Sequence, residues 1–174
     1  MPFELQPTLT GDRVILRPLQ ESDWNELFQV ASDRLIWEQH PNNDRYQEPV
    51  FREFFSGAMA SGGAFAAVDP AKGVIIGSTR YYGLNEEDSE IEIGWTFLAR
   101  AYWGGETNRE MKRMMLQHAF KYVHSVLFSI GPTNYRSQLA VLKIGAVRDG
   151  SRISPAGQES FIYRIGPDAA ILFE

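Results

Sequence analysis

The sequence predicts an α/β domain in which antiparallel strands precede a strand, a glycine turn and a helix. Two observations predict this class. Short segments in which apolar and polar residues alternate are separated by turn formers, as in antiparallel sheets. Other segments repeat their apolar residues at the spacing of an amphipathic helix. The 174 residues, 44% of them apolar, suffice for one domain with a buried core. We therefore expect a single domain over residues 1–174.

The first elements are a strand and two helices. Residues 13–17 alternate in polarity and predict a strand. Asp23 and Glu26 have the spacing of a capping box, which predicts that a helix begins there. From Glu48 onward a proline in the first turn and phenylalanines at helical spacing predict a second helix, which ends at the glycine pair 62–63.

Three strands follow in quick succession, over residues 64–68, 74–82 and 90–98. The segments between them are rich in Asp, Pro, Gly and Asn, which favour tight turns. Because the connections are this short, we expect the three strands to be antiparallel.

The third of these strands leads into a turn that contains Gly104 and Gly105, and a long amphipathic run begins at Thr107. The first amides of a helix have no partner within it, and the helix dipole is positive at that end. The backbone of this turn can therefore bind phosphate. Two glycines before a helix are also typical of a plain tight connection, so the motif alone is a weak signal.

The remaining elements are a strand, a helix and a hairpin. Residues 126–130 form a short apolar run that suits a strand buried on both faces. Either Asn134 or Ser137 can cap the next helix. Residues 147–154 and 161–165 predict a terminal hairpin around a Pro-Ala-Gly turn.

Composition excludes several classes of function. A formal net charge of −5 provides no general field for polyanions, and no basic patch stands out, so we expect no nucleic-acid partner and no anionic membrane. The absence of cysteine excludes disulfides, thiolate zinc sites and a cysteine nucleophile. Residues 1–10 carry no secretory pattern and no apolar run approaches ~18 residues, so we expect a cytoplasmic protein.

The histidines do not predict a metal site. His40, His118 and His124 lack the spacing of metal ligands. His118 lies on the apolar face of the helix that begins at Thr107, where a core histidine is the expected role. We therefore expect no metal.

The order strand, glycine turn, helix, strand, followed by residues 134–137 (Asn-Tyr-Arg-Ser) and a helix that ends at 143–146, resembles the GNAT superfamily of N-acetyltransferases. Within it the chain is most similar to the RimJ/RimL branch. Residues 9–19 resemble the first strand of that branch. The resemblance covers nearly the whole chain. It implies a GNAT fold, with a mixed, mostly antiparallel sheet of seven strands and helices on both faces. It also implies a splay between the fourth strand, 90–98, and the fifth, 126–130.

The resemblance implies acetyl-CoA as cosubstrate, lying in the splay. Its pantetheine would run along the backbone of Phe97 and Leu98, Asn134 would hold that arm, and its pyrophosphate would lie on the amides of the glycine turn. The residues that the resemblance assigns to this ligand are Phe97, Leu98, Arg100, Trp103, Gly104, Gly105, Glu106, Thr107, Asn108 and Asn134.

The turn departs from the family pattern, which usually has Gln or Arg first and Gly or Ala last. Here Ala101 takes the first position, Arg100 comes one place early and Glu106 takes the last. Either the Glu106 carboxylate points away from the phosphates, or it lowers the affinity for CoA, or the protein has drifted from the reaction.

Three basic residues, Arg109, Lys112 and Arg113, occupy the first turns of the following helix. Cations there oppose the helix dipole unless an anion binds. The alternative is an ordinary solvated face whose charge Glu106 and Glu110 balance.

Glu92 is the best candidate for a general base that removes a proton from the attacking amine. Strict alternation places it with Thr96 on the face opposite Trp95 and Phe97. The alternative for Glu92 is a structural ion pair with a neighbour such as Arg80.

Two further catalytic features come from the resemblance. It places an oxyanion-binding N–H at a bulge around residues 93–95, and it makes Ser137 a proton donor to the CoA sulfur. Helix capping would explain Ser137 and Asn134 equally well.

The acceptor groove is implied by the resemblance alone, and it would be walled by aromatic residues of the second helix and the segment before it. Aromatic residues at helical spacing are also typical of a core. The residues concerned are Trp37, Tyr46, Phe51, Phe54 and Phe55.

We expect transfer of an acetyl group to a primary amine, with the amino terminus of a protein or peptide as the first choice. Such an amine is ~10% neutral at pH 7 and a lysine only ~0.04%. A small amine or an amine antibiotic is the alternative acceptor, and a catalytically weak acyl-CoA-binding protein is the alternative of another class. The oligomeric state stays open, with a homodimer as one alternative.

Overall fold

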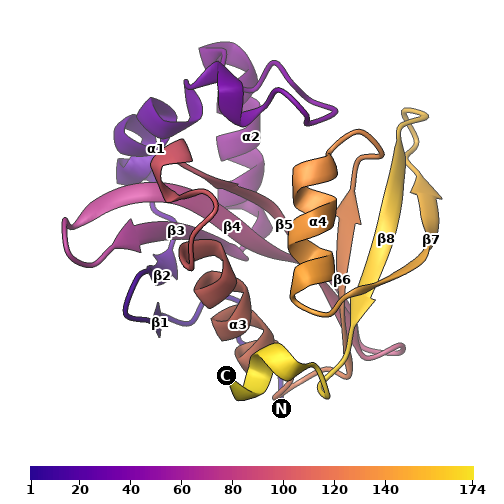
Figure 1. Ribbon diagram of the computed structural model, residues 1–174. Helices are drawn as coiled ribbons and strands as arrows, with labels where there is room; N and C mark the ends of the chain where they lie inside the picture. The colour runs from indigo at the N-terminus through magenta and orange to yellow at the C-terminus, as the bar shows by residue number, and fades with distance from the viewer.

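The computed structural model describes residues 1–174, which fold around one eight-stranded sheet (Figure 1). Its strands are β1 (Leu9–Thr10), β2 (Ile15–Pro18), β3 (Ala64–Asp69), β4 (Val74–Asn85), β5 (Glu90–Leu98), β6 (Ser125–Ile130), β7 (Val147–Ile153) and β8 (Glu159–Ile165). Their order across the sheet is β1-β2-β3-β4-β5-β6-β8-β7. Every neighbouring pair is antiparallel except β5 and β6, which are parallel.

The predicted mixed, mostly antiparallel sheet is confirmed, with one strand more than the seven expected. The additional strand is β1, whose two residues pair with β2 in the register Leu9–Leu16 and Thr10–Ile15. Two residues are too few for alternation to show in the sequence, so β1 becomes visible only through its pairing.

Helices cover both faces of the sheet, as expected. They are α1 (Trp24–Ala31), α2 (Glu48–Ser61), α3 (Thr107–Ala119) and α4 (Tyr135–Lys143), with short 3₁₀ turns at Glu21–Asp23, Arg34–Ile36, Arg100–Tyr102 and Ala170–Phe173. One buried cluster joins α1 and α2 to the sheet, and another joins α3 and α4 to its opposite face. No helix has the length and the apolar character that crossing a bilayer requires.

The predicted capping box at the start of α1 is wrong. The Asp23 carboxylate accepts hydrogen bonds from Arg17 at 2.8 and 2.9 Å and from the Gln20 N–H, so Asp23 closes a box with Gln20 instead. Glu26 accepts from the N–H of Ile75. Partners distant in the sequence therefore replace the local pairing.

Other helix ends follow the sequence. Gly62 ends α2 with a left-handed φ of 68°, which glycine adopts without a steric penalty. α3 begins at Thr107. Of the two candidate caps of α4, it is Asn134 that accepts the N–H of Ser137.

Candidate active site

The sheet opens between β5 and β6. The two strands pair only through Glu90–Ser125, Ile91–Val126 and Glu92–Leu127, although each continues further. Figure 1 shows them separating, with α4 in front of the region between them. The edge of β5 after Glu92 therefore has peptide groups without a partner strand on that side, at the predicted site of the pantetheine arm.

β5 contains a bulge at the predicted place. The register with β4 shifts between the pairs Arg80–Gly94 and Ser78–Phe97, and Trp95 has a φ of +51°. One extra residue in β5 reverses the alternation beyond it. The prediction that Thr96 shares the face of Glu92 is therefore wrong. Trp95 and Phe97 pack in the cluster with α2, on the side opposite Ile93.

The glycine turn presents a run of free backbone donors. None of the N–H groups from Gly104 to Arg109 donates to a backbone carbonyl, whereas Glu110 returns to Glu106 at 2.9 Å. Gly104 has a φ of +71°, and a Cβ built at Gly104 or Gly105 would meet no atom within 4 Å. The turn is thus open to a ligand and lined with donors, which fits a diphosphate.

Two arginines near this turn, Arg100 and Arg109, already have partners, whereas Arg113, which lines the same cavity as Glu106, forms no ion pair. Arg100 Nε donates to Asp33 at 2.5 Å, and Arg109 pairs with Glu174. Both pairs are partly exposed, so they are screened and exchange easily. The unpaired donors at this turn are therefore its backbone amides, with the side chain of Arg113 beside them.

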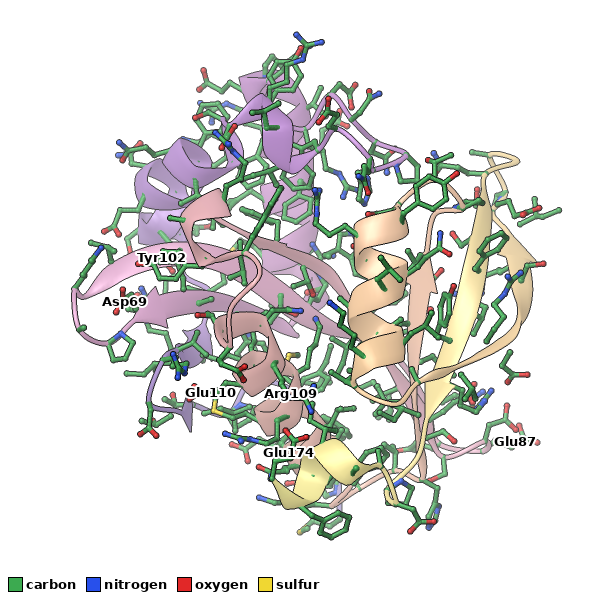
Figure 2. The ribbon with its side chains drawn as sticks, viewed as in Figure 1. Asp69, Glu87, Tyr102, Arg109, Glu110 and Glu174 are labelled. Atoms are coloured by element: carbon green, nitrogen blue, oxygen red, sulfur yellow. The ribbon has the colours of Figure 1, made fainter.

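Glu106 lines a charged surface cavity of about 300 Å³ at the start of α3. Figure 2 labels three of the residues around it, Arg109, Glu110 and Glu174. The charge of Glu106 contributes to the raised pKa of Arg109, behind the larger effect of Glu174. The three alternatives considered for this carboxylate remain predictions.

Trp103 and Arg136 meet beside the splay. Trp103 Nε1 donates to the carbonyl of Leu98 at 2.9 Å, so one predicted pantetheine acceptor already has a partner within the chain. The Arg136 guanidinium lies 3.8 Å from the centre of the Trp103 ring. This cation–π pair joins the glycine turn to the first turn of α4.

Asn134 and Ser137 lie at the start of α4. The Asn134 side chain is buried, and its oxygen accepts the Ser137 N–H at 3.4 Å. The capping role of Asn134 is therefore confirmed. Its amide hydrogens remain for another acceptor. The donor role of Ser137 stays a prediction.

Glu92 is buried on the side of the sheet that faces away from α3. Its Oε1 accepts from Arg152 Nη1 at 2.8 Å, so the structural partner is Arg152 and not Arg80. Arg152 is about half exposed and comes from β7, beyond β6 and β8. A half-exposed guanidinium thus pairs with a buried carboxylate.

Lys112 contradicts both predictions made for it, because it is neither a phosphate ligand nor part of a solvated face. It is 5% exposed, and its Nζ donates to Thr96 Oγ1 at 2.7 Å. Burial lowers the pKa of this amine to about 7. The bulge turns Thr96 toward α3, which creates the single partner of Lys112.

Two arginines that the sequence did not assign to the site lie on the side of Glu92. They are Arg80 on β4 and Arg45 before α2, and neither forms an ion pair. Arg80 appeared in the sequence only as a candidate partner of Glu92. A basic residue inside an otherwise apolar strand was the signal available.

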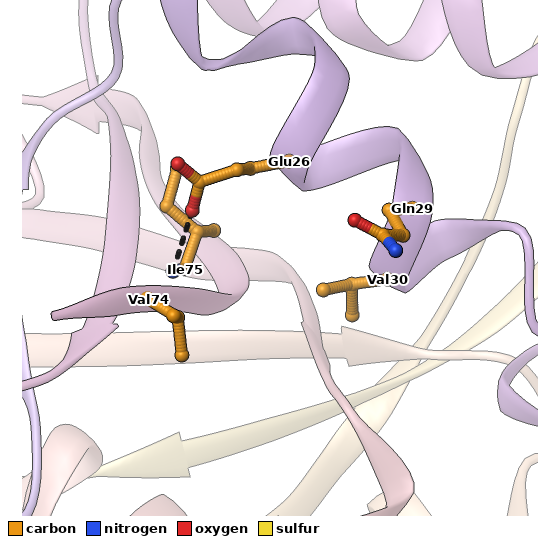
Figure 3. Close-up of a pocket in the computed structure, with 5 residues that line it drawn as sticks. All are labelled: Glu26, Gln29, Val30, Val74 and Ile75. Carbon is orange, nitrogen blue, oxygen red and sulfur yellow. Dashed lines mark hydrogen bonds between the residues drawn. The ribbon is translucent and has the colours of Figure 1, made fainter. Parts of the chain in front are cut away.

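A further cavity, of about 330 Å³, lies between α1 and the start of β4 (Figure 3). Glu26, Gln29, Val30, Val74 and Ile75 line it, and the Glu26 carboxylate is occupied by the Ile75 N–H. None of the predicted site residues is among them.

The histidines and acidic residues form no metal site, since no group of three or more potential ligands gathers anywhere in the chain. His118 is buried, with its Nε2 at 2.7 Å from the Glu4 carbonyl, which fits the predicted core role.

Comparison with known proteins identifies the family. Residues 13–147 match the acetyltransferase (GNAT) domain. An acetyltransferase of the GNAT family from Bacillus anthracis is 20% identical, covers 92% of this chain and 98% of its own, and has a TM-score of 0.75. A GCN5-related N-acetyltransferase from Brucella melitensis is 18% identical, with 95% and 80% covered and a TM-score of 0.78.

A third solved structure contains a bound ligand. RimJ from Mycobacterium smegmatis, in complex with CoA-disulfide, is 19% identical to this chain, covers 95% of it and 91% of its own length, and has a TM-score of 0.71. At these identities the solved structures establish the fold.

Proposed function

The chain belongs to the GNAT acetyltransferase family, and we propose that it transfers an acetyl group from acetyl-CoA to a primary amine. The observation that carries this proposal is the run of unpaired N–H groups from Gly104 to Arg109, beside a sheet that opens after Glu92. A ligand with a diphosphate and an extended amide-bearing arm satisfies both features. The CoA-disulfide bound to the RimJ of Mycobacterium smegmatis supports a ligand of this type.

The residues that would hold acetyl-CoA come from three elements. The amides of the turn would bind the pyrophosphate, the free edge of β5 near Phe97 would pair with the pantetheine arm, and the Asn134 amide group would donate to it. Trp103 occupies the Leu98 carbonyl, so a ligand that uses this carbonyl must first displace the indole N–H.

Acetyl-CoA would supply an activated acetyl thioester. The chain has no cysteine, so we propose direct attack by the amine without an acetyl-cysteine. The bulge at Gly94–Trp95 would direct a backbone N–H at the oxygen where negative charge develops. Glu92 would take the amine proton, directly or through water, and Ser137 would donate a proton to the departing sulfur.

We propose the amino terminus of a protein or peptide as the acceptor, and a small amine, including an amine antibiotic, as the alternative. A terminal amine is far more often neutral at pH 7 than a lysine, so its attack depends less on proton removal by Glu92. We also propose that this reaction takes place in the cytoplasm.

A second candidate function is binding of acyl-CoA without turnover. Two observations favour it: the carboxylate of Glu106 at the family's small-residue position, and the indole of Trp103 on the Leu98 carbonyl.

Calorimetry with CoA and a thiol-release assay over a panel of amines separate the two functions. The proposed transferase binds CoA and releases thiol only when an amine is present. CoA binding with no thiol release across amino acids, peptides and small amines would leave the binding protein. Absence of CoA binding would contradict both functions.

A further inference from the structure

The side of the sheet that carries Glu92 contains two positive charges that nothing in the protein neutralises. Arg80 is only 5% exposed, and its Nε is the single buried side-chain nitrogen or oxygen without a hydrogen-bond partner. The only polar side chain within hydrogen-bond distance of the Arg45 guanidinium is His40, with 3.4 Å between Arg45 Nη1 and His40 Nε2. Six of the thirteen arginines form ion pairs, and among the other seven Arg80 is the only one that is buried.

Aromatic rings hold both guanidinium groups in place. Arg80 Cζ lies 4.4 Å from the centre of the Trp95 ring and 5.5 Å from that of Phe54. Arg45 Cζ lies 5.0 Å from the same Phe54 ring and 5.7 Å from Trp37. Two cations therefore share one ring, an arrangement that fixes their positions and leaves their N–H groups unused.

The two charges act on each other. Burial lowers the pKa of Arg80 to about 10. Burial, and then the charge of Arg80, lower that of Arg45 to about 10 as well. The exposed Asp44 opposes the shift at Arg45 but forms no ion pair with it. A buried, unpaired cation is costly, and a second one beside it adds to the cost, so the folded chain lacks a counter-anion here.

The position of this pair relates it to the acceptor. Arg80 pairs with Gly94 at the bulge, and Tyr82, two residues further along β4, pairs with Glu92. Arg80 and Glu92 are thus about 7 Å apart along the sheet, on the same face. An acceptor whose amine faces Glu92 places a group a few bonds away beside Arg80.

We propose that Arg80 and Arg45 form an anion subsite, and that the acceptor is a primary amine that also carries a carboxylate. This inference rests on the proposed acetyl transfer and narrows its substrate class. A planar carboxylate accepts two parallel N–H bonds from a guanidinium, which Lys could not provide in the same geometry. A free amino acid and a peptide that begins with Asp or Glu share this chemistry.

The test compares matched pairs of amines in the thiol-release assay. One arm uses free amino acids and their α-amides, and the other uses peptides beginning with Glu or Gln. In at least one arm we expect kcat/KM for the carboxylate to exceed that for its neutral partner by about 10- to 100-fold, the range of a charge-assisted hydrogen bond. The arm that shows the preference identifies the source of the carboxylate.

Variants assign the preference to the two arginines. Arg80→Gln and the less buried Arg45→Gln should each reduce, at least several-fold, the ratio of kcat/KM for the carboxylate-bearing amine to kcat/KM for its neutral partner. Arg52→Gln is the matched control, because Arg52 lies 4.6 Å from the Trp24 ring on the outer side of α2 and keeps the preference. Equal kcat/KM for both members of every pair in the wild type would overturn the proposal. An unchanged preference in both Arg80→Gln and Arg45→Gln would also overturn it.

Binding of glutarate keeps this test separate from acetyl transfer. Because Arg80 stacks on Trp95, we expect glutarate to change the tryptophan fluorescence and glutaramide to leave it unchanged, with glutarate binding lost in Arg80→Gln. Glutarate binding without turnover of any amine would contradict the proposed function and support the subsite. Turnover of amines without glutarate binding and without a carboxylate preference would support the proposed function and contradict the subsite.

Discussion

The glycine turn and the face of the sheet that carries Glu92, which we call the proposed acceptor side, offer hydrogen-bond donors in different ways. At the turn, consecutive backbone N–H groups are free, and two of the neighbouring arginines are paired, Arg100 with Asp33 and Arg109 with Glu174. On the proposed acceptor side β5 pairs with β4 on one edge, and the side-chain donors without an ion pair are those of Arg80 and Arg45.

This difference suits the two ligands that we propose for these places. A diphosphate is the same in every molecule of CoA, and backbone donors at a helix start bind it whatever their side chains are. Acceptors differ in shape and charge, so specificity requires side chains from several elements. We expect changes of backbone freedom to affect CoA binding, and changes of side chain to affect the acceptor reaction.

The largest effect is expected for Glu92→Gln, which keeps the size of the side chain and removes the base. The value of kcat should fall by about 100- to 10,000-fold, the contribution of a positioned general base. Calorimetry should show an unchanged affinity for CoA, because the turn does not involve this side chain. Glu90→Gln is the control, since Glu90 is in the same strand and pairs with Arg164.

An activity of Glu92→Gln within about threefold of the wild type would assign Glu92 to structure alone, through its ion pair with Arg152. The proposal that the proposed acceptor side supplies a general base would then be contradicted.

The next largest effect is expected for substitution of Lys112, which lies on α3 and contacts β5 through Thr96. This effect is on stability and not on substrate choice. Its pKa of about 7 means that the folded chain releases a proton that the unfolded chain keeps up to about pH 10.4. The free energy of unfolding should therefore rise with pH between about 7 and 10, and the penalty of the buried charge should be fully present below about pH 7.

Lys112→Met should remove this rise and increase the free energy of unfolding at pH 7 by about 1–4 kcal/mol. Thr96 keeps its contact with Thr79 at 2.8 Å, so the substitution leaves no unpaired hydroxyl. Urea unfolding from pH 6 to 10 measures both effects, with the exposed Lys121→Met as control. A wild-type stability that does not change over this range would show that Lys112 has an ordinary pKa.

The parts of the fold that the sequence predicted correctly depend on residues close together in the chain. The start of α3 at Thr107, the Asn134 cap and the end of α2 at Gly62 each follow from a few neighbouring side chains. The glycine turn belongs to this group, because its free amides result from the local geometry of a helix start.

The parts that the sequence missed depend on contacts between distant segments. The resemblance implied a bulge in β5, but the contact that the bulge creates between Thr96 and Lys112 was missed, because it depends on how α3 packs on the sheet. Arg45 and Arg80 meet on Phe54 although 35 positions separate them in the chain. Charged residues in a helix or strand are normally solvated, so their burial becomes evident only when the elements pack.

The smallest effect is expected for substitution of Gly104, and a matched glycine separates loss of ligand binding from backbone strain. Gly104 and Gly73 have nearly the same φ, +71° and +69°, and neither has an atom within 4 Å of a built Cβ. Gly104→Ala and Gly73→Ala should therefore each lower the free energy of unfolding by about 1–2 kcal/mol, the cost of a left-handed alanine.

Only Gly104→Ala should also weaken CoA binding in calorimetry, by about tenfold, because an alanine that relaxes toward negative φ turns its amide away from the phosphates. Gly73 lies in the β3–β4 turn, where no ligand is proposed. Equal CoA affinity in the two variants would mean that the glycine turn tolerates a backbone change. It would contradict the expectation that CoA binding depends on the backbone conformation of this turn.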